Sequence, residues 1–303
     1  MIFGLSTRWN ASRHTSGEAM VEEILGLGLD FIELGYDLRM DLVPGVYKLA
    51  QEGTVKIHSV HNFCPVPVGA PKGHPELFTL ASSDPRIREG AVHHTTKTLR
   101  FSASVGAKVV VVHAGNVEMT RMTNSLKTMH EQGEAFSERY DKLKMKLLLT
   151  REKKVRKQLD YLRQGIELLL PILAETGVQM ALENLPTWEG IPTEMEMENL
   201  CKQYAAQGLR YWHDIGHGQI RQNLGLINQE RWMERLQPYM AGMHIHDVVA
   251  PATDHLLPPH GEVDFTPLKR FAKGDVIRVI EPAPQTPGEF VVEALRILRQ
   301  AWA

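Results

Sequence analysis

Eight short apolar runs are spaced along the chain, and a helix-like segment follows each of them. Several runs are nearly continuous in apolar residues instead of alternating, which is typical of strands covered on both faces. The runs are IFGLS near residue 2, FIELG near 31, VKIHSV from 55, AKVVVVHAG from 107, VQMALEN from 178, LRYWHD from 209, YMAGMHIHD from 239 and VIRVIEP from 276. Eight β-then-α units predict a (β/α)₈ TIM barrel formed by a single domain over residues 1–303.

A doubly wound open sheet is the competing architecture for such an alternation. The barrel is favoured because the first unit has no Gly-rich phosphate-binding fingerprint and the candidate functional residues are spread over many strand ends. The length of 303 residues, with 43% hydrophobic residues, is ordinary for one barrel of this kind. Six expected helices end in a glycine just before the next strand, at Gly28, Gly53, Gly106, Gly177, Gly208 and Gly274.

One segment, residues 117–155, does not fit the repeat and is interpreted as a helical insertion after the fourth strand. It is rich in lysine and arginine between Lys142 and Lys157, but Leu143 and Leu147 place an apolar face among them. A solvated extension of the following helix, a lid over the pocket mouth and a contact with a second subunit are the open interpretations. The interleaved apolar face argues against an arm that binds nucleic acid.

Four apolar runs in the second half of the chain each end in a residue that can bind a metal. These residues are Glu183, Asp214, His244 and Glu281. A carboxylate at the end of a buried strand is costly unless its charge is compensated. Carboxyl ends of barrel strands meet at one face, so the four residues are predicted to converge on one shared metal site. Oxygen ligands with one imidazole suit Mn²⁺, Mg²⁺, Co²⁺ or Zn²⁺.

Several histidines flank the same face of the predicted barrel. His113 ends the fourth run, His61 follows the third, and His217 lies three residues beyond Asp214. Glu33, at the end of the second run, is a further candidate for the rim of the site. The histidines interpreted as structural or surface residues are His58, His93, His94 and His213.

The segments ALEN, DIGH, HIHD and VIEP resemble the xylose isomerase-like barrel superfamily, which includes sugar isomerases, sugar epimerases and endonuclease IV, an AP endonuclease of family 2. The stretch HGEVDF, residues 260–265, is similar to the superfamily's loop after strand seven, with Pro259 at the position of the first glycine. The resemblance covers about residues 2–300, apart from the insertion. It implies a metal-dependent isomerase or epimerase of a sugar or sugar phosphate.

The resemblance also implies roles for individual residues. Glu183, Asp214, His244 and Glu281 would bind one divalent metal ion, and Glu183 and Glu281 would act as acid and base. Proton removal beside a metal-bound carbonyl gives an enediolate, and the second carboxylate can return a proton to the opposite face. His217 would bind a substrate hydroxyl, while His61 and His113 would shape the pocket.

Two other activities remain open at this point. An endonuclease IV-like enzyme with three zinc ions would use His61, His113 and His217 as extra ligands, with Asp254 and His255 replacing an Asp-x-His pair. The net charge of −2 lacks the basic footprint that binding to a nucleic acid backbone requires. A metal-dependent dehydratase or lyase acting on a sugar-like substrate is the other alternative. The pair of glutamates argues against a barrel that only binds.

The composition also indicates the cellular setting. Two cysteines, Cys64 and Cys201, are too few for a disulfide framework. The start MIFGLSTRWN lacks the features of a secretory signal, and no run of about 18 apolar residues occurs. We therefore expect a cytoplasmic protein with a small-molecule sugar as its partner. Which sugar it is, and whether it carries a phosphate, stays open.

Overall fold

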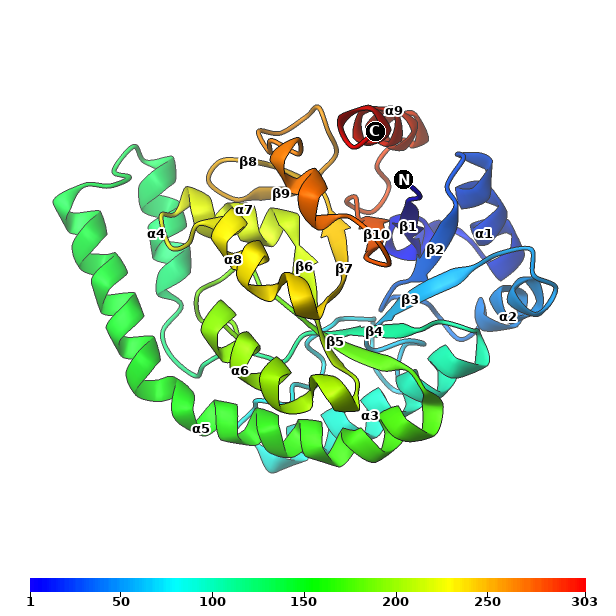
Figure 1. The fold of residues 1–303 in the computed structure, drawn as a ribbon, viewed down its shortest axis with the longest axis horizontal. Helices are drawn as coiled ribbons and strands as arrows, with labels where there is room; N and C mark the ends of the chain where they lie inside the picture. Colours follow the sequence, from blue (N-terminus) through cyan, green and yellow to red (C-terminus); the bar gives the residue numbers. More distant parts are fainter.

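The computed structural model describes residues 1–303 and contains a closed barrel of eight parallel strands (Figure 1). The order around the barrel is β1-β10-β7-β6-β5-β4-β3-β2. The strands are β1 (Gly4–Ser6), β2 (Phe31–Leu34), β3 (Ile57–His61), β4 (Val109–Val112), β5 (Gln179–Glu183), β6 (Leu209–Asp214), β7 (Met240–Ile245) and β10 (Ile277–Ile280). Each strand lies on one of the eight apolar runs, so the predicted barrel is confirmed.

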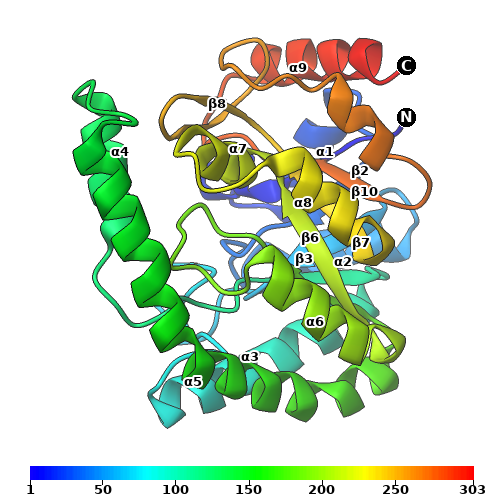
Figure 2. The ribbon, with the colours of Figure 1, turned by 60° about the vertical axis from the view of Figure 1, so that its left-hand side comes forward.

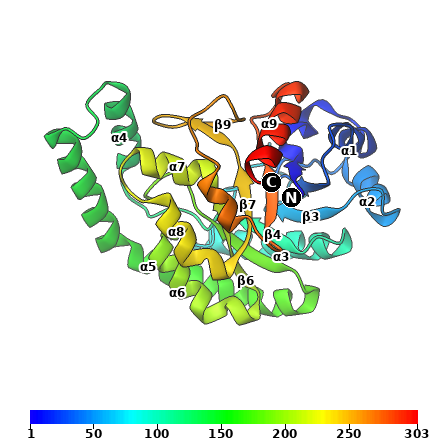
Figure 3. The ribbon, with the colours of Figure 1, turned by 45° about the horizontal axis from the view of Figure 1, so that its top comes forward.

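Helices follow the strands and surround the barrel (Figure 3). They are α1 (Gly17–Gly26), α2 (Val43–Gln51), α3 (Pro85–Ser104), α4 (Met122–Glu131), α5 (Glu138–Thr176), α6 (Glu194–Tyr204), α7 (Ile215–Asn223), α8 (Gln229–Leu236) and α9 (Gly288–Ala301). None of them has both the length and the apolar character needed to cross a membrane. The six glycines expected to stop helices all have positive φ, for example 67° at Gly177.

The segment between β7 and β10 differs from the expectation. An antiparallel hairpin of β8 (Asp247–Val249) and β9 (Thr253–Leu256) follows β7 and was not predicted. The helix-like segment that follows the seventh apolar run, TPLKRFAKG at residues 266–274, is only a short 3₁₀ segment, Pro267–Phe271. The hairpin and its loop occupy the preceding residues, and β10 begins at Ile277, so little chain is left for a full helix.

Side chains alternate between the two faces of each strand, so the candidate functional residues lie inside the barrel above a layer of apolar side chains. This layer is called the apolar floor below. On β4, Val110 and Val112 belong to the main core, whereas Val109 and Val111 belong to a separate buried cluster. The members of that inner cluster are Phe31, Val109, Val111, Ala181, Trp212 and Val279. Since side chains two residues apart share a face of a strand, the next inner layer consists of polar residues. They include Glu33, His113, Glu183, Asp214 and Glu281.

Gly242 on β7 makes room for the largest side chain of this floor. A Cβ atom at this position would overlap the ring of Trp212. Gly242→Ala is therefore expected to destabilise the barrel by about 1–3 kcal/mol, as other overpacked cores are destabilised. The free energy of unfolding in denaturant measures the effect. Gly26→Ala is the control, because its Cβ would meet no atom within 4 Å and helix α1 favours alanine. Equal stability of the two variants would contradict the packing argument.

The insertion after β4 consists of α4 and the first half of α5. Helix α5 is continuous over 39 residues, beginning after Ser137, whose side chain accepts a hydrogen bond from the Tyr140 N–H, and ending before Gly177. Its second half packs against α3 beside the barrel, and its first half extends past the barrel with α4 at its side (Figure 2). The first half of α5 thus continues the helix that follows β4 beyond the barrel.

The insertion packs against elements that follow the candidate site residues. A buried cluster joins α4 and α5 to α7 and β8, and it contains Met122, Leu126, Met129, Tyr140, Leu147, Ile220, Leu224 and Val248. At the start of α4, the Thr123 N–H donates to Glu189 Oε1 at 3.0 Å, which ties the insertion to the loop after β5. The insertion therefore supports one wall of the barrel mouth. A contact with a second subunit stays a prediction.

Candidate metal centre and active site

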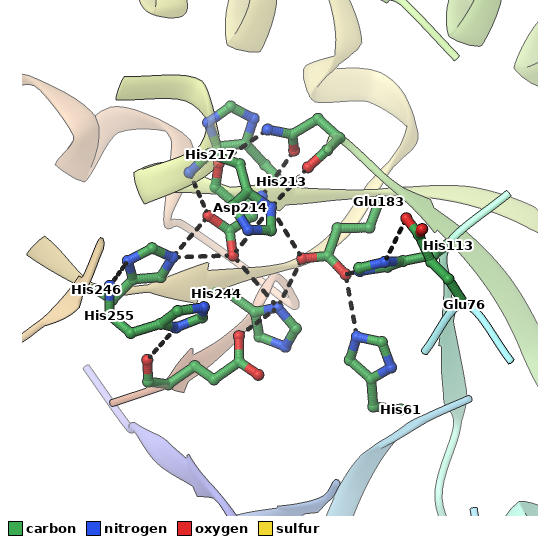
Figure 4. Close-up of polar contacts among 12 residues, drawn as sticks. His61, Glu76, His113, Glu183, His213, Asp214, His217, His244, His246 and His255 are labelled. Carbon is green, nitrogen blue, oxygen red and sulfur yellow. Dashed lines mark hydrogen bonds and ion pairs between the residues drawn. The ribbon is translucent and has the colours of Figure 1, made fainter. Parts of the chain in front are cut away.

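The four residues predicted as metal ligands come together at the carboxyl ends of β5, β6, β7 and β10, and Figure 4 shows Glu183, Asp214 and His244 among them. His244 Nδ1 lies 3.1 Å from Glu183 Oε1 and 3.4 Å from Glu281 Oε2. Asp214 Oδ2 lies 3.8 Å from the same nitrogen. All four side chains are buried. Ligand atoms of Glu183, Asp214 and His244 lie within 4.8 Å of one another, and Glu281 approaches from the neighbouring strand.

The three carboxylates stay ionised although they are buried. Burial alone would raise the pKa of Glu183, but His244 and His113 hold this pKa well below its usual range. Burial also opposes ionisation of Glu281, yet His244 and Arg8 lower its pKa to about 2. The pKa of Asp214 is likewise lowered against burial, chiefly by neighbouring histidines. Three charged oxygen ligands and one imidazole form a donor set that fits a divalent cation.

Glu33 fixes the orientation of His244. Expected at the rim of the site, Glu33 instead lies fully buried below it, and His244 Nε2 is 3.0 Å from Glu33 Oε1. Ser59 Oγ donates to Glu33 Oε2 at 2.8 Å. Because a carboxylate only accepts hydrogen bonds, Nε2 carries the proton, and Nδ1 points toward the other carboxylates. Such a carboxylate behind a ligating histidine is a common support of metal sites.

Asp214 is held in place by Asn184 and His246. The Asp214 backbone N–H donates to Asn184 Oδ1 at 2.8 Å, and Asn184 Nδ2 donates to the Asp214 carbonyl at 2.9 Å. His246 Nδ1 accepts the His255 N–H at 2.9 Å, so its Nε2 donates to Asp214 Oδ1, also at 2.9 Å. A Cβ at Gly216 would overlap the His246 ring. These contacts give physical reasons for the residues of ALEN, DIGH and HIHD.

The three histidines predicted to bind substrate lie directly against the carboxylates. His61 Nε2 and His113 Nε2 are 3.2 Å and 3.0 Å from Glu183 Oε2. His217 Nδ1 donates to the Asn184 carbonyl at 2.9 Å, which leaves its Nε2 free. Burial opposes protonation of His113, but Glu183 and Glu76 raise its pKa to about 9. The structure thus brings all three to the candidate centre.

The side chains that could bind a metal ion form three neighbouring groups. They are His61, His113 and Glu183; Glu183, Asp214 and His244; and His217, His246 and His255. His61 Nδ1 lies 3.1 Å from the Asn62 carbonyl oxygen, and its Nε2 lies 3.2 Å from Glu183 Oε2, so His61 adds a donor atom beside the Glu183 carboxylate. The donor set is therefore larger than one ion requires.

Some residues of this site were not predicted. Arg8 follows β1, with Nη1 3.7 Å from Glu281 Oε1 and 3.3 Å from the His255 ring nitrogens. Its position just past a strand end could have indicated it. Glu76, whose Oε1 is 3.7 Å from His113 Nδ1, lies in the long loop after β3, and no sequence pattern indicates it. His213, expected to be structural, pairs with Tyr211 and Gln229 away from the centre.

A cavity of about 700 Å³ opens beside this centre. Its walls come from the segments after β1, β2, β3 and β10, all at the carboxyl ends of the strands. Arg8, which contacts Glu281, lines it together with Tyr36 and Asp37. The ring of Tyr36 meets the ring of His61 edge-on, with centroids 5.1 Å apart. The volume is in the range of small-molecule binding sites.

The fold and the site define a (β/α)₈-barrel protein with a candidate metal centre at the carboxyl ends of its strands. A family model described as "Xylose isomerase-like TIM barrel" matches residues 21–300, and the chain belongs to this family. Uncharacterized protein MJ1614 of Methanocaldococcus jannaschii is 25% identical over 265 residues, covering 86% of this chain and 83% of the relative.

Two solved structures have a similar fold. A D-tagatose 3-epimerase-like protein superimposes with a TM-score of 0.71 at 20% identity, covering 99% of this chain and 97% of that chain. The 3-keto-D-glucoside 4-epimerase YcjR of E. coli has a TM-score of 0.69 at 15% identity, with 99% of both chains covered. At these identities the comparison supports the fold.

Proposed function

We propose that this protein is a divalent-metal-dependent isomerase or epimerase that acts on a sugar. The observation that carries the proposal is the placement of Glu183 and Glu281, whose carboxylates approach His244 Nδ1 from β5 and β10. These strands are separated by β6 and β7 in the barrel, so the two glutamates reach the centre from different directions. The sugar epimerases among the proteins of similar fold support this assignment.

The residues of the chain have distinct proposed roles. A divalent ion held by Glu183, Asp214, His244 and Glu281 would supply Lewis-acid polarisation of a substrate carbonyl. One glutamate, as the carboxylate, would remove the proton from the carbon beside that carbonyl, and the other, which has to carry a proton in the complex with substrate, would deliver that proton to the opposite face. His217, with Nδ1 engaged by a backbone carbonyl, presents Nε2 to a substrate hydroxyl.

Solvent deuterium exchange tests the proposal. Protein loaded with Mn²⁺ and incubated in D₂O with a panel of free and phosphorylated ketoses is expected to incorporate deuterium beside the carbonyl, as followed by NMR. Chelation should abolish the exchange, and readdition of metal should restore it. Chelation should also lower the unfolding temperature, because an ion at 100 times its Kd stabilises the folded state by about 2.7 kcal/mol. Exchange that persists in metal-free protein, or is missing from loaded protein across the panel, would refute the proposal.

An endonuclease-like activity with three metal ions is the second candidate, and the three neighbouring ligand groups favour it. The group of His61, His113 and Glu183 is the particular reason to consider an ion in addition to the one proposed at His244. Metal analysis of protein purified without chelator distinguishes the two functions. One equivalent is expected for the sugar enzyme, and three equivalents with cleavage of DNA at abasic sites would support the second candidate.

A further inference from the structure

A second cavity, of about 580 Å³, opens at the amino ends of the barrel strands, opposite the candidate metal centre. Six of the residues that line it are the first residues of their strands, namely Phe31, Ile57, Val109, Gln179, Met240 and Ile277. Phe31 and Val109 also belong to the apolar floor. The floor therefore separates this cavity from the candidate metal centre, and the volume is in the range of small-molecule binding sites.

Cationic side chains surround this cavity. Lys108, Arg210 and Arg278 line it together with the imidazole of His58, and the exposed Asp275 is the single carboxylate among the lining residues. None of the three cations forms an ion pair within the protein. Burial alone lowers the pKa of Arg278, because no carboxylate lies close enough to oppose it. The uncompensated charge of the cavity wall is therefore positive.

The two arginines keep N–H groups that no acceptor of the protein uses. Arg278 is buried, with Nε donating to the Ile2 carbonyl at 3.0 Å and Nη1 donating to the Ala272 carbonyl. Arg210 Nη1 donates to the Ala205 carbonyl at 2.6 Å. These bonds to the backbone hold both guanidinium groups in place, while Nη2 of each has no partner. A guanidinium held in this way is well suited to bind the oxygens of a phosphate group.

His58 lies within the same positive potential. Its ring stacks on Phe31 with centroids 4.1 Å apart, and the Lys108 N–H donates to the His58 carbonyl at 3.2 Å. Burial lowers the pKa of His58, and the charges of Lys108, Lys56 and Arg278 lower it further. An anion bound beside these cations offsets their charge, so its binding raises this pKa.

We propose that this cavity is a second binding site, which binds a phosphate group through Lys108, Arg210 and Arg278. Phosphate oxygens accept several hydrogen bonds at once, and the negative charge of phosphate compensates the cations of the wall. The volume also leaves room for the organic part of a phosphate ester against Phe31 and Val109. The site lies on the other side of the apolar floor from the candidate metal ligands, so it is separate from the proposed function.

Calorimetry on matched variants tests the site. The protein as purified is titrated with inorganic phosphate and with AMP at constant ionic strength, and saturable binding of one equivalent is expected. Lys108→Gln and Arg210→Gln should each weaken binding by about 10-fold or more, the loss expected for a hydrogen bond to a charged group. Lys273→Gln is the control, because Lys273 is an exposed lysine of the loop before β10 that does not line the cavity. It should leave the affinity nearly unchanged, since exposed charges are screened by salt.

The two ligands distinguish the source of the phosphate group. Tighter binding of AMP indicates a phosphate ester as the ligand, and tighter binding of inorganic phosphate indicates the free ion. Absence of saturable binding of both would overturn the proposal. An equal loss of affinity in Lys273→Gln would show general attraction of anions instead of a site. Lys108 is exposed and its side chain makes no hydrogen bond, so Lys108→Gln remains a folded test even if Arg210→Gln is destabilised.

NMR titration of His58 locates the bound anion. The pKa of its ring, assigned with a His58→Gln variant, is expected to rise when phosphate saturates the wild-type protein. In Lys108→Gln the same concentration of phosphate should raise it less. An unchanged pKa of His58 in the presence of bound phosphate would place the anion elsewhere on the protein and refute the assignment of this cavity.

Discussion

Glu183→Gln and Glu281→Gln are each expected to slow deuterium exchange at the substrate carbon by about 10²-fold or more. Glutamine keeps the shape of the side chain, but its amide neither takes up the proton nor carries the negative charge of the carboxylate. Both residues are buried beside His244, so no water molecule of the bulk solvent easily replaces the lost base. Exchange rates by NMR at saturating Mn²⁺ measure the loss, and thermal unfolding shows that the barrel is intact.

Each substitution removes a proposed metal ligand as well as a proposed base, so weaker metal binding has to be distinguished from slower proton transfer. Each variant is therefore assayed over a range of Mn²⁺ concentrations, with bound metal determined in parallel. Glu76→Gln is the matched control, because Glu76 is a nearby carboxylate that contacts His113 and none of the proposed ligands. It is expected to lose less than about 10-fold. Turnover near the wild-type rate in either Glu183→Gln or Glu281→Gln, with metal bound, would assign the proton transfer to other residues.

The barrel and the four candidate ligands could be predicted because they depend on a local pattern. Each strand is short and apolar, and the inner face repeats every second residue. Ala181 and Glu183 on β5 share the inner face, as do Trp212 and Asp214 on β6. A functional residue that ends such a run must therefore lie above the apolar floor. The length of each strand and the position of its last polar residue were therefore enough to predict that these side chains lie on one face of the barrel.

Helix α7 could not be predicted, because its sequence reflects contacts with distant parts of the chain. It contains Gly216 and Gly218, which lower helix propensity. A side chain at Gly216 would overlap His246, and one at Gly218 would overlap Gln229. Side chains from other segments leave room only for glycine at both positions. This packing constraint outweighs the low helix propensity of glycine.

The residues that hold the candidate metal ligands and their loops in place were not predicted, for a similar reason. His246 bonds to Asp214 on another strand and to the backbone of His255 in an unpredicted hairpin. Asp247 accepts the N–H groups of Gly261 and Val263 and so shapes the HGEVDF loop. These hydrogen bonds join loops that are distant in the sequence, and no periodic pattern of the sequence predicts them. The buried position of Glu33 below His244, in place of the expected rim, is another such pairing.

Glu33→Gln is expected to weaken binding of Mn²⁺ by about 10- to 100-fold, the usual effect of removing the partner of a ligating histidine. In the wild-type protein Glu33 accepts the Nε2 proton of His244 and leaves Nδ1 directed at Glu183, Asp214 and Glu281. The amide of glutamine has no charge to hold that proton, and its NH₂ group favours the tautomer that carries the proton on Nδ1, where it occupies the lone pair needed by the metal. Competition with a fluorescent chelator measures the affinity without reference to turnover.

Ser59→Ala is the matched control for this experiment. Ser59 Oγ donates to Glu33 Oε2, and its removal leaves the carboxylate and its bond to His244 in place. A smaller change in Mn²⁺ affinity is therefore expected for Ser59→Ala than for Glu33→Gln. If the two variants lose affinity equally, general disturbance of the barrel interior explains the effect. If Glu33→Gln binds Mn²⁺ as tightly as the wild-type protein, His244 does not depend on Glu33 for its orientation, and the metal lies elsewhere in the site.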